Sequence, residues 1–294
     1  MLLNKHGTFY IRNGWPTKIV DAILENDKIF SPNNELEAVD TIGVGRVMIK
    51  AMRYWASVLG ITLEEKTPLG ISNRLTDIGN AINVYDPYFN DRGSLWLLHR
   101  NLATDMDNAT AWAWAFNKFG SNRFNKNEFC TALYAYIQHE GSEYNKKAVE
   151  KEFDCFKNTY VSDKDFDIDK IIEEDTLPFF APLNLIIYSG KGEFEKRKCH
   201  AKDIPAKILL YCVILDNKEH LSVNSQIDIE HLLNDEMQVG KYMNLSYAVL
   251  LELLQQLESE KYLKLVNNFG NKYIQLDVKD SGYILEQYFQ ENMR

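Results

Sequence analysis

The sequence predicts a mainly α-helical protein with winged helix-turn-helix units at its N- and C-terminal ends, a helical middle domain and short β-hairpin wings. Two observations support this fold class. Apolar residues recur at helical spacing through most of the chain, and turn residues separate the periodic stretches. At each end, short helical patterns are followed by a longer one and then by two short strands. We therefore expect three domains, over residues 1–85, 86–165 and 166–294.

The N-terminal domain shows the helix-turn-helix order most clearly. Helices are predicted over 16–24 and 35–41, and Gly43 supplies the tight turn before a third helix that runs from Val44 to Gly60. The segment 61–75 then has the alternation and turn residues of a hairpin. This succession is typical of a winged unit that binds DNA.

The third predicted helix separates apolar and basic residues onto two faces. The apolar stripe comprises Val44, Val47, Met48, Ala51, Trp55, Val58 and Leu59. The opposite face carries Arg46, Lys50, Arg53 and Ser57, and no acidic residue occurs between Thr41 and Leu63. Arginine and lysine at this spacing suit contact with base edges and phosphates. The alternative is a solvated face of an ordinary amphipathic helix.

Flanking residues extend this basic face in the prediction. We expect phosphate contacts from Lys5, Lys18, Lys66 and Arg74, which would make binding dependent on salt.

The middle domain is predicted to be helical over 94–103, 109–119, 126–140 and 145–160, with Asn125 and Ser142 as N-caps. An acidic segment follows, in which Asp163, Asp165, Asp167 and Glu174 have the spacing of a calcium loop. The position that requires glycine in such a loop holds Ile168. A solvated acidic linker is therefore the favoured interpretation.

The C-terminal domain is predicted to contain helices over 204–215, 228–233 and 246–258 and a hairpin over 263–276. Its long helix carries Glu252, Glu258 and Glu260, which would repel phosphates. We expect this helix to pack within the chain or against a partner, including a second copy in a homodimer. A DNA contact by the hairpin turn is the minor alternative.

Composition excludes several classes of function. The four cysteines are far apart and no secretion signal or membrane-spanning stretch is present, so we expect a cytoplasmic protein without disulfides, bound metal or cofactor. No catalytic motif is found, and His99 lies in an amphipathic helix as a structural residue. The net charge of −9 counts against nucleic acid unless a local basic face governs docking.

Several strings resemble the DUF4007 family of bacterial proteins. They cover the first 130 residues in order, and the C-terminal half matches loosely. The strings are KHGTFYIRNGW at 5–15, IGVGRVMIKAMRYW at 42–55, LTDIG at 75–79, DPY at 86–88, SLWLLH at 94–99 and AWAWAFN at 111–117. The family's usual Asn or Lys after the second glycine of GVG is Arg46 here, which strengthens the charge of the basic face.

The resemblance implies a cellular context and no catalytic residues. Such proteins look like companions of DNA phosphorothioation and other restriction-type phage-defence systems, beside a sulfur-transfer enzyme of the PAPS-reductase type. Their layout is also similar to winged-helix accessory proteins of the BREX defence systems.

The N-terminal string at 5–15 has two interpretations. Alternating Phe9, Ile11 and Trp15 favour a half-buried strand that anchors the N-terminus. Alternatively, Lys5, His6 and Arg12 form a patch that touches phosphate or a modified backbone.

Taken together, the sequence predicts a non-catalytic, double-stranded DNA-binding accessory or regulatory subunit of a bacterial DNA-modification or anti-phage system. The alternative is an interaction scaffold in the same system that binds other defence proteins without touching DNA. An enzyme that acts on nucleic acid through an unrecognised site is a third, weaker interpretation.

Overall fold

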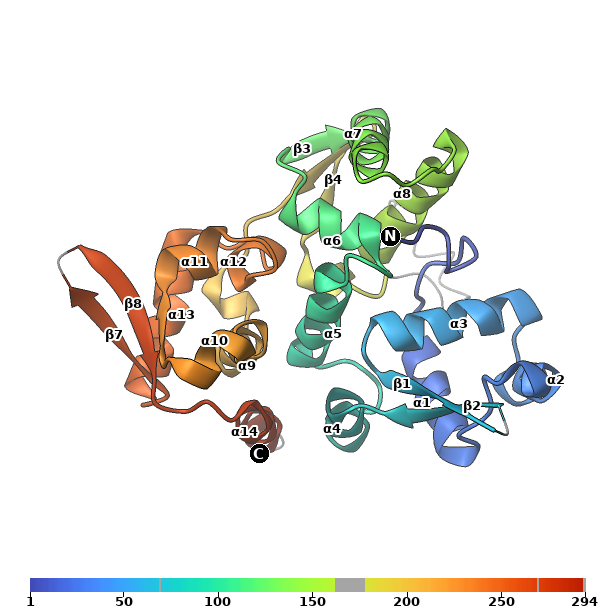
Figure 1. The fold of residues 1–294 in the computed structure, drawn as a ribbon, viewed down its shortest axis with the longest axis horizontal. Coiled ribbons are helices and arrows are strands. Elements are labelled where there is room, and N and C mark those ends of the chain that lie inside the picture. The colour runs from blue at the N-terminus through green and yellow to red at the C-terminus, as the bar shows by residue number, and fades with distance from the viewer. Residues whose placement is uncertain (69, 162–177, 269, 293–294) are drawn as a thin grey trace, which may run out of the picture.

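The structure is a computed structural model that describes residues 1–68, 70–161, 178–268 and 270–292. It is mainly helical with small antiparallel sheets, which confirms the predicted class at that level (Figure 1). None of the helices in these ranges is long and apolar enough to cross a membrane.

The N-terminal elements follow the predicted order. They are α1 (Trp15–Glu25), η1 (Pro32–Asn34), α2 (Glu35–Ile42), α3 (Arg46–Val58), β1 (Thr62–Thr67), β2 (Gly70–Leu75) and α4 (Asp77–Tyr85). Gly43 ends α2 in the left-handed region, with φ 75°, and its N–H donates to Val39 O. Glycine tolerates this conformation without a steric penalty, so the chain turns directly into α3. Strands β1 and β2 pair antiparallel from Thr62↔Leu75 to Thr67↔Gly70.

The buried face of α3 agrees only in part with the predicted stripe. The predicted residues that are buried are Ala51, Trp55, Val58 and Leu59. Ile49, Met52 and Ala56 face the core together with Trp55, whereas Val47 is 57% exposed. Apolar residues occupy most positions of this helix, so its period fits more than one buried face. Packing of α3 against α1 and α2 selects the face that contains Ile49 and Met52.

The middle of the chain contains the predicted helices, with bounds that differ by a few residues. They are α5 (Arg92–Thr104), α6 (Thr110–Asn117), α7 (Lys126–His139) and α8 (Lys146–Tyr160). Asn125 caps α7, as predicted, and Glu128 completes a reciprocal capping box with it. The prediction of Ser142 as an N-cap is wrong. Its N–H donates to Ile137 O in the turn after α7, and Asn145 caps α8 by accepting from the N–H of Ala148.

A three-stranded sheet joins segments that are distant in the sequence. Its strands are β3 (Arg123–Asn125), β4 (Ile186–Gly190) and β5 (Glu193–Lys196), in the order β3-β5-β4. Phe124 pairs with Phe194 at its centre. This sheet was not predicted, and it crosses the expected limit at residue 165. The three domain boundaries remain predictions.

The C-terminal elements surround a second three-stranded sheet in the order β6-β8-β7. The helices are η3 (Ala181–Leu183), η4 (Ala201–Asp203), α9 (Ala206–Asp216), α10 (Lys218–Val223), α11 (Ile229–Asn234), α12 (Val239–Tyr242), α13 (Tyr247–Ser259) and α14 (Ser281–Asn292). The strands are β6 (Gln226–Asp228), β7 (Leu263–Asn268) and β8 (Asn271–Leu276). The last helix, α14, packs on both α9 and α4, so the end of the chain returns to the N-terminal part (Figure 1).

The acidic helix α13 packs within the chain. Its buried residues are Leu250, Leu253, Leu254 and Leu257. Glu258 Oε1 accepts from the N–H of Leu265, and Glu260 lies 3.0 Å from Lys207 Nζ. Two of its three carboxylates therefore bind neighbouring residues of the same chain.

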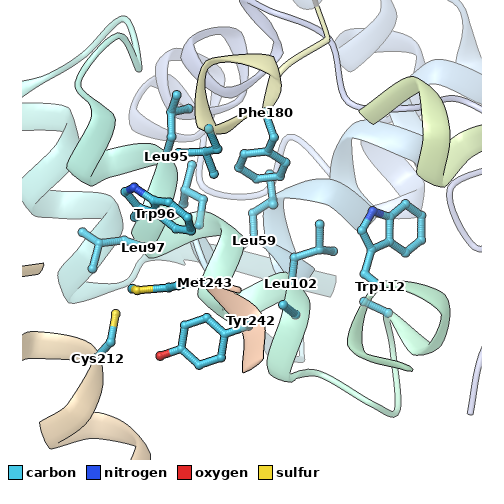
Figure 2. Close-up of a cluster of buried hydrophobic side chains, with 14 of the residues drawn as sticks. Leu59, Leu95, Trp96, Leu97, Leu102, Trp112, Phe180, Cys212, Tyr242 and Met243 are labelled. Atoms are coloured by element: carbon cyan, nitrogen blue, oxygen red, sulfur yellow. The ribbon is translucent and has the colours of Figure 1, made fainter. Parts of the chain in front are cut away.

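Helix α5 lies at the centre of the molecule. Trp96, Leu97 and Leu102 of α5 pack with Tyr242 and Met243, the last residue of α12 and its C-cap (Figure 2). Fully buried His99 of the same helix contacts the Tyr160 hydroxyl at 3.0 Å and Tyr242 O at 2.8 Å. Burial lowers the pKa of His99 to about 4, so its imidazole is neutral at pH 7. The histidine is structural, as predicted.

We expect His99 to make stability decrease in mild acid. Its pKa is about 6.5 in the unfolded chain and about 4 in the folded one, so between these values the unfolded state binds more protons. The free energy of unfolding should fall by about 2 kcal/mol between pH 7.5 and pH 5 from this residue alone. Urea unfolding of His99→Gln should show a lower stability at pH 7.5 and a shallower loss toward pH 5.

The exposed His139 supplies the control for this measurement, since its side chain is 85% accessible. His139→Gln should keep the slope of the unchanged protein. An equal slope in His99→Gln would contradict the assignment of the acid sensitivity to His99.

Candidate nucleic-acid interface

The exposed side of α3 carries most of the predicted basic face. Arg46, Lys50 and Ser57 are exposed, and Arg53 is half-buried. They occupy one side because Ile49, Met52 and Ala56 turn the other side toward α1 and α2. Val47 lies exposed beside Arg46. The face therefore combines cations with a small apolar surface.

Two of the three cations on this face contact carboxylates. Lys50 Nζ lies 3.3 Å from Glu35 Oε1, although the lysine side chain remains 73% accessible. Arg53 binds both carboxylate oxygens of Glu64. Its Nε donates to Oε1 at 2.5 Å, and its Nη2 donates to Oε2 at 2.7 Å. This hydrogen bonding raises the pKa of Arg53. Among the described residues no ion pair is found for Arg46.

The remaining predicted contacts are spread over neighbouring elements. Lys66 is exposed in β1, next to the hairpin turn. Arg74 in β2 pairs with Glu65 across the hairpin at 2.6 Å. Lys18 is exposed on α1, whose opposite side is buried. The hairpin thus presents a mixture of charges and not a uniformly basic wing.

The N-terminal segment is anchored, but not as a strand. Residues 1–14 form turns and a single bridge between Arg12 and Pro178. Ile11 is fully buried, and the Trp55 indole Nε1 donates to Phe9 O at 2.9 Å. The prediction of a strand is therefore wrong, while the predicted anchoring role is confirmed for Ile11.

The patch of Lys5, His6 and Arg12 is also wrong as a surface feature. His6 is fully buried, its Nε2 lies 3.1 Å from Glu152 Oε2, and its ring stacks on Trp55. Arg12 is half-buried, with its guanidinium 5.6 Å from the Trp15 ring centroid. Only Lys5 is exposed. The alternation of residues in this string gave no sign that α8, which supplies Glu152, covers His6.

The sequence analysis did not predict the carboxylates that pair with the basic face of α3. Glu35 and Glu64 lie just outside the acid-free window between Thr41 and Leu63. Helix α2 and strand β1 bring them back to α3. The signal available in the sequence was their position in the two elements that flank α3.

Possible metal ligands do not gather in the described parts of the chain. No group of three or more His, Cys, Asp or Glu side chains with a geometry suited to a metal ion occurs there. The calcium-loop spacing over 163–174 and the acidic linker assigned to it lie outside the described residues. All four cysteines are free thiols.

Comparison with known proteins places the chain in a family. The family model described as "Protein of unknown function (DUF4007)" matches residues 3–289. The chain belongs to the DUF4007 family. No protein with a curated description matches it.

Two solved structures share the fold of this DUF4007 chain. A magnesium ion-bound SspB crystal structure superposes with a TM-score of 0.84 and an SspB crystal structure with 0.82. Each is 22% identical in sequence, and each match covers 98% of this chain and 88% of the other. At this identity the similarity shows the fold alone.

We expect the Arg53–Glu64 pair to contribute modestly to stability. Both side chains are about 30% accessible, and half-exposed ion pairs are worth roughly 0.5–1 kcal/mol. Glu64→Gln should therefore lower the free energy of unfolding by about that amount in urea titrations. Glu65→Gln, which removes the more exposed pair with Arg74, should cost less. A loss above about 3 kcal/mol for Glu64→Gln would indicate a structural role beyond the ion pair.

Proposed function

We propose that the protein binds double-stranded DNA as a non-catalytic accessory subunit, with its N-terminal part acting as a winged helix-turn-helix unit. The observation that carries this proposal is the exposed side of α3, where Arg46, Lys50 and Ser57 project from one helix without an acidic residue on it. Arginine offers a planar fork to guanine edges or phosphates, and lysine offers a point charge to the backbone.

The arrangement around α3 supports a groove-binding role. A glycine turn separates α2 from α3, and the β1–β2 hairpin follows α3 directly. In winged units, the helix after such a turn enters the major groove and the hairpin lies along the backbone. Exposed Lys66, near the hairpin turn, then meets a phosphate.

The C-terminal part has a comparable order of elements but a different charge. Strand β6 lies between α10 and α11, strands β7 and β8 follow α13, and the three strands form a sheet in the order β6-β8-β7. The exposed Glu252 and the bonded Glu258 and Glu260 make α13 a poor match for phosphates. We therefore assign the groove contact to α3 and not to α13.

The carboxylates beside α3 make DNA binding a competition. Lys50 and Arg53 exchange Glu35 and Glu64 for phosphate when a duplex approaches. Arg46 has no carboxylate partner among the described residues, so it binds a phosphate without giving one up. The exchange lowers affinity and favours sites where base contacts add to the phosphate contacts.

The proposed cellular setting is a bacterial DNA-modification or anti-phage system. It rests on the resemblance of the N-terminal strings to proteins that accompany phosphorothioation systems. A phosphorothioate carries one soft sulfur in place of oxygen, and the cations of α3 lie beside the exposed Val47. That combination suits a backbone that is both charged and partly apolar.

An interaction scaffold in the same system is the second candidate. The net charge of −9 favours it, because an acidic protein is repelled from DNA at long range. Recovery of partner proteins from the native host, with and without nuclease, separates the two. The scaffold would be supported if partner proteins remain bound after nuclease treatment and the purified protein does not bind DNA.

Removing the exposed cations should weaken DNA binding without unfolding the protein. We expect Arg46→Gln with Lys50→Gln to lower affinity for a labelled duplex at least about tenfold and to reduce the salt dependence by about two phosphate contacts. Fluorescence anisotropy at rising salt measures both quantities. The control Lys218→Gln with Lys264→Gln removes two exposed charges from the C-terminal part. Equal losses in the two double variants would place the contact elsewhere.

Removing the competing carboxylates should have the opposite effect. We expect Glu35→Gln with Glu64→Gln to raise duplex affinity several-fold, because Lys50 and Arg53 no longer exchange partners. Glu219→Gln with Glu252→Gln changes the net charge equally and controls for the long-range field. An equal gain in the control would show that only the net charge matters.

The same titrations test the remaining parts of the proposal. A preference between plain and phosphorothioated duplexes shows whether the modification is sensed. The relative bound magnesium in its crystal, so the labelled duplex is also incubated with and without this ion. Metal-dependent cleavage would replace the accessory role by an enzymatic one.

A further inference from the structure

A small cavity in the C-terminal half gathers lysines. It has a volume of about 360 Å³ and lies between the chain after α6, strand β5 with the residues that follow it, and the segment from α11 to the start of α13. Lys118, Lys196, Lys198 and Lys241 line it, together with polar groups that include Asn122 and Asn244. None of the described residues that line this cavity is a carboxylate.

Lys196 is the most buried of the four lysines, with 9% of its surface exposed. Its Nζ donates to Ala115 O at 2.6 Å and to Phe119 O, and the Phe119 ring centroid lies 4.9 Å away. An ammonium group has three N–H donors, so two carbonyls leave one to be matched. A buried cation without a carboxylate is costly. Burial first, and then the charges of Lys241 and Lys198, lower the pKa of Lys196 to about 7.

The other lysines add to the positive potential. Lys198 Nζ donates to Leu245 O at 3.1 Å, and burial and Lys241 lower its pKa. Lys118 is matched by Glu236, which lies 2.6 Å away and outside the cavity lining. No ion pair is found in the described ranges for Lys196, Lys198 or Lys241. Three lysines thus lie close together without a carboxylate partner among the described residues.

We propose that this lysine cavity binds a phosphate group. A multivalent anion relieves the mutual repulsion of Lys196, Lys198 and Lys241 and accepts hydrogen bonds from their ammonium groups. The volume is at the small end of the range for ligand sites, which suits a phosphoryl or diphosphoryl group with little attached to it. Exposed Lys118 and Asn122 at the rim give the anion access from solvent.

The inference is independent of the proposed DNA contact, since α3 contributes nothing to the cavity. The phosphate has two possible sources, a small free ligand or the backbone of a nucleic acid. Both present the same chemistry to the lysines, and the experiment separates them.

The test is isothermal titration with inorganic pyrophosphate at pH 7. We expect saturable binding by the unchanged protein and at least about tenfold weaker binding by Lys198→Gln with Lys241→Gln. Lys196 is left in place because its two carbonyl contacts support the fold. The control Lys218→Gln with Lys264→Gln should bind as the unchanged protein does. No saturable binding, or equal weakening in both double variants, would overturn the proposal.

Parallel titrations with ADP and with a short duplex identify the source. If the cavity variant weakens only pyrophosphate and ADP binding, the ligand is a small phosphate compound. If it also weakens duplex binding, the cavity holds a backbone phosphate. Arg46→Gln with Lys50→Gln should leave pyrophosphate binding unchanged, so a failure of the α3 proposal remains distinct from a failure here.

Binding of sulfate, which stays fully ionised, should weaken as pH rises from 6 to 8.5. The cause is loss of the Lys196 proton around pH 7. The other charged groups lining the cavity are Lys118, Lys198 and Lys241, with Glu236 paired to Lys118. Affinity that is constant or rises across this range would contradict a role of Lys196 in holding the anion.

Discussion

The fold depends on the polar contacts that side chains of α5 make with elements on either side of it. His99 joins Tyr160 at the end of α8 to the carbonyl of Tyr242 at the end of α12. The next residue of α5, Arg100, lies 2.6 Å from Asp216, which also accepts from the Tyr242 hydroxyl at 2.5 Å. His99 and both tyrosines are buried, and the side chains of Arg100 and Asp216 are 16% and 3% accessible, so these polar groups find their partners inside the protein. A single helix therefore fixes the position of the middle and C-terminal elements together.

The same helix also holds the N-terminal elements. The Asn101 amide donates to Leu59 O, the residue that follows α3, at 2.9 Å. This hydrogen bond fixes the end of α3 to the buried helix α5. The lysine cavity is likewise built against α6, which packs directly on α5. Helix α5 therefore connects the exposed side of α3 to the lysine cavity.

Local patterns predicted much of the secondary structure. Asn125 with Glu128 and Gly43 are strong local signals, and the helices next to them begin or end within two residues of the prediction. The sheet of β3, β5 and β4 was missed because its strands are three to five residues long and β3 pairs with β5 across some 70 residues. No local period identifies such a pairing.

The candidate site was harder to predict than the fold class. The cations on α3 are visible in the sequence, but Glu35 and Glu64 reach them only through the turns before and after the helix. His6 had a surface role in the prediction because Glu152 is 146 residues away along the chain. Lys196, Arg197 and Lys198 are adjacent in the sequence, and this run of cations was the available signal for the lysine cavity.

The burial of His6 against Glu152 has a consequence for biosynthesis. The first ten residues complete their packing only against α8, and α4 is covered only when α14, at the other end of the chain, is present. During translation the surface of the N-terminal part is closed only after α8 and α14 have left the ribosome. Contacts of such long sequence separation slow folding and leave apolar surface open to chaperones. Native packing of the N-terminal elements is therefore completed by residues synthesised much later.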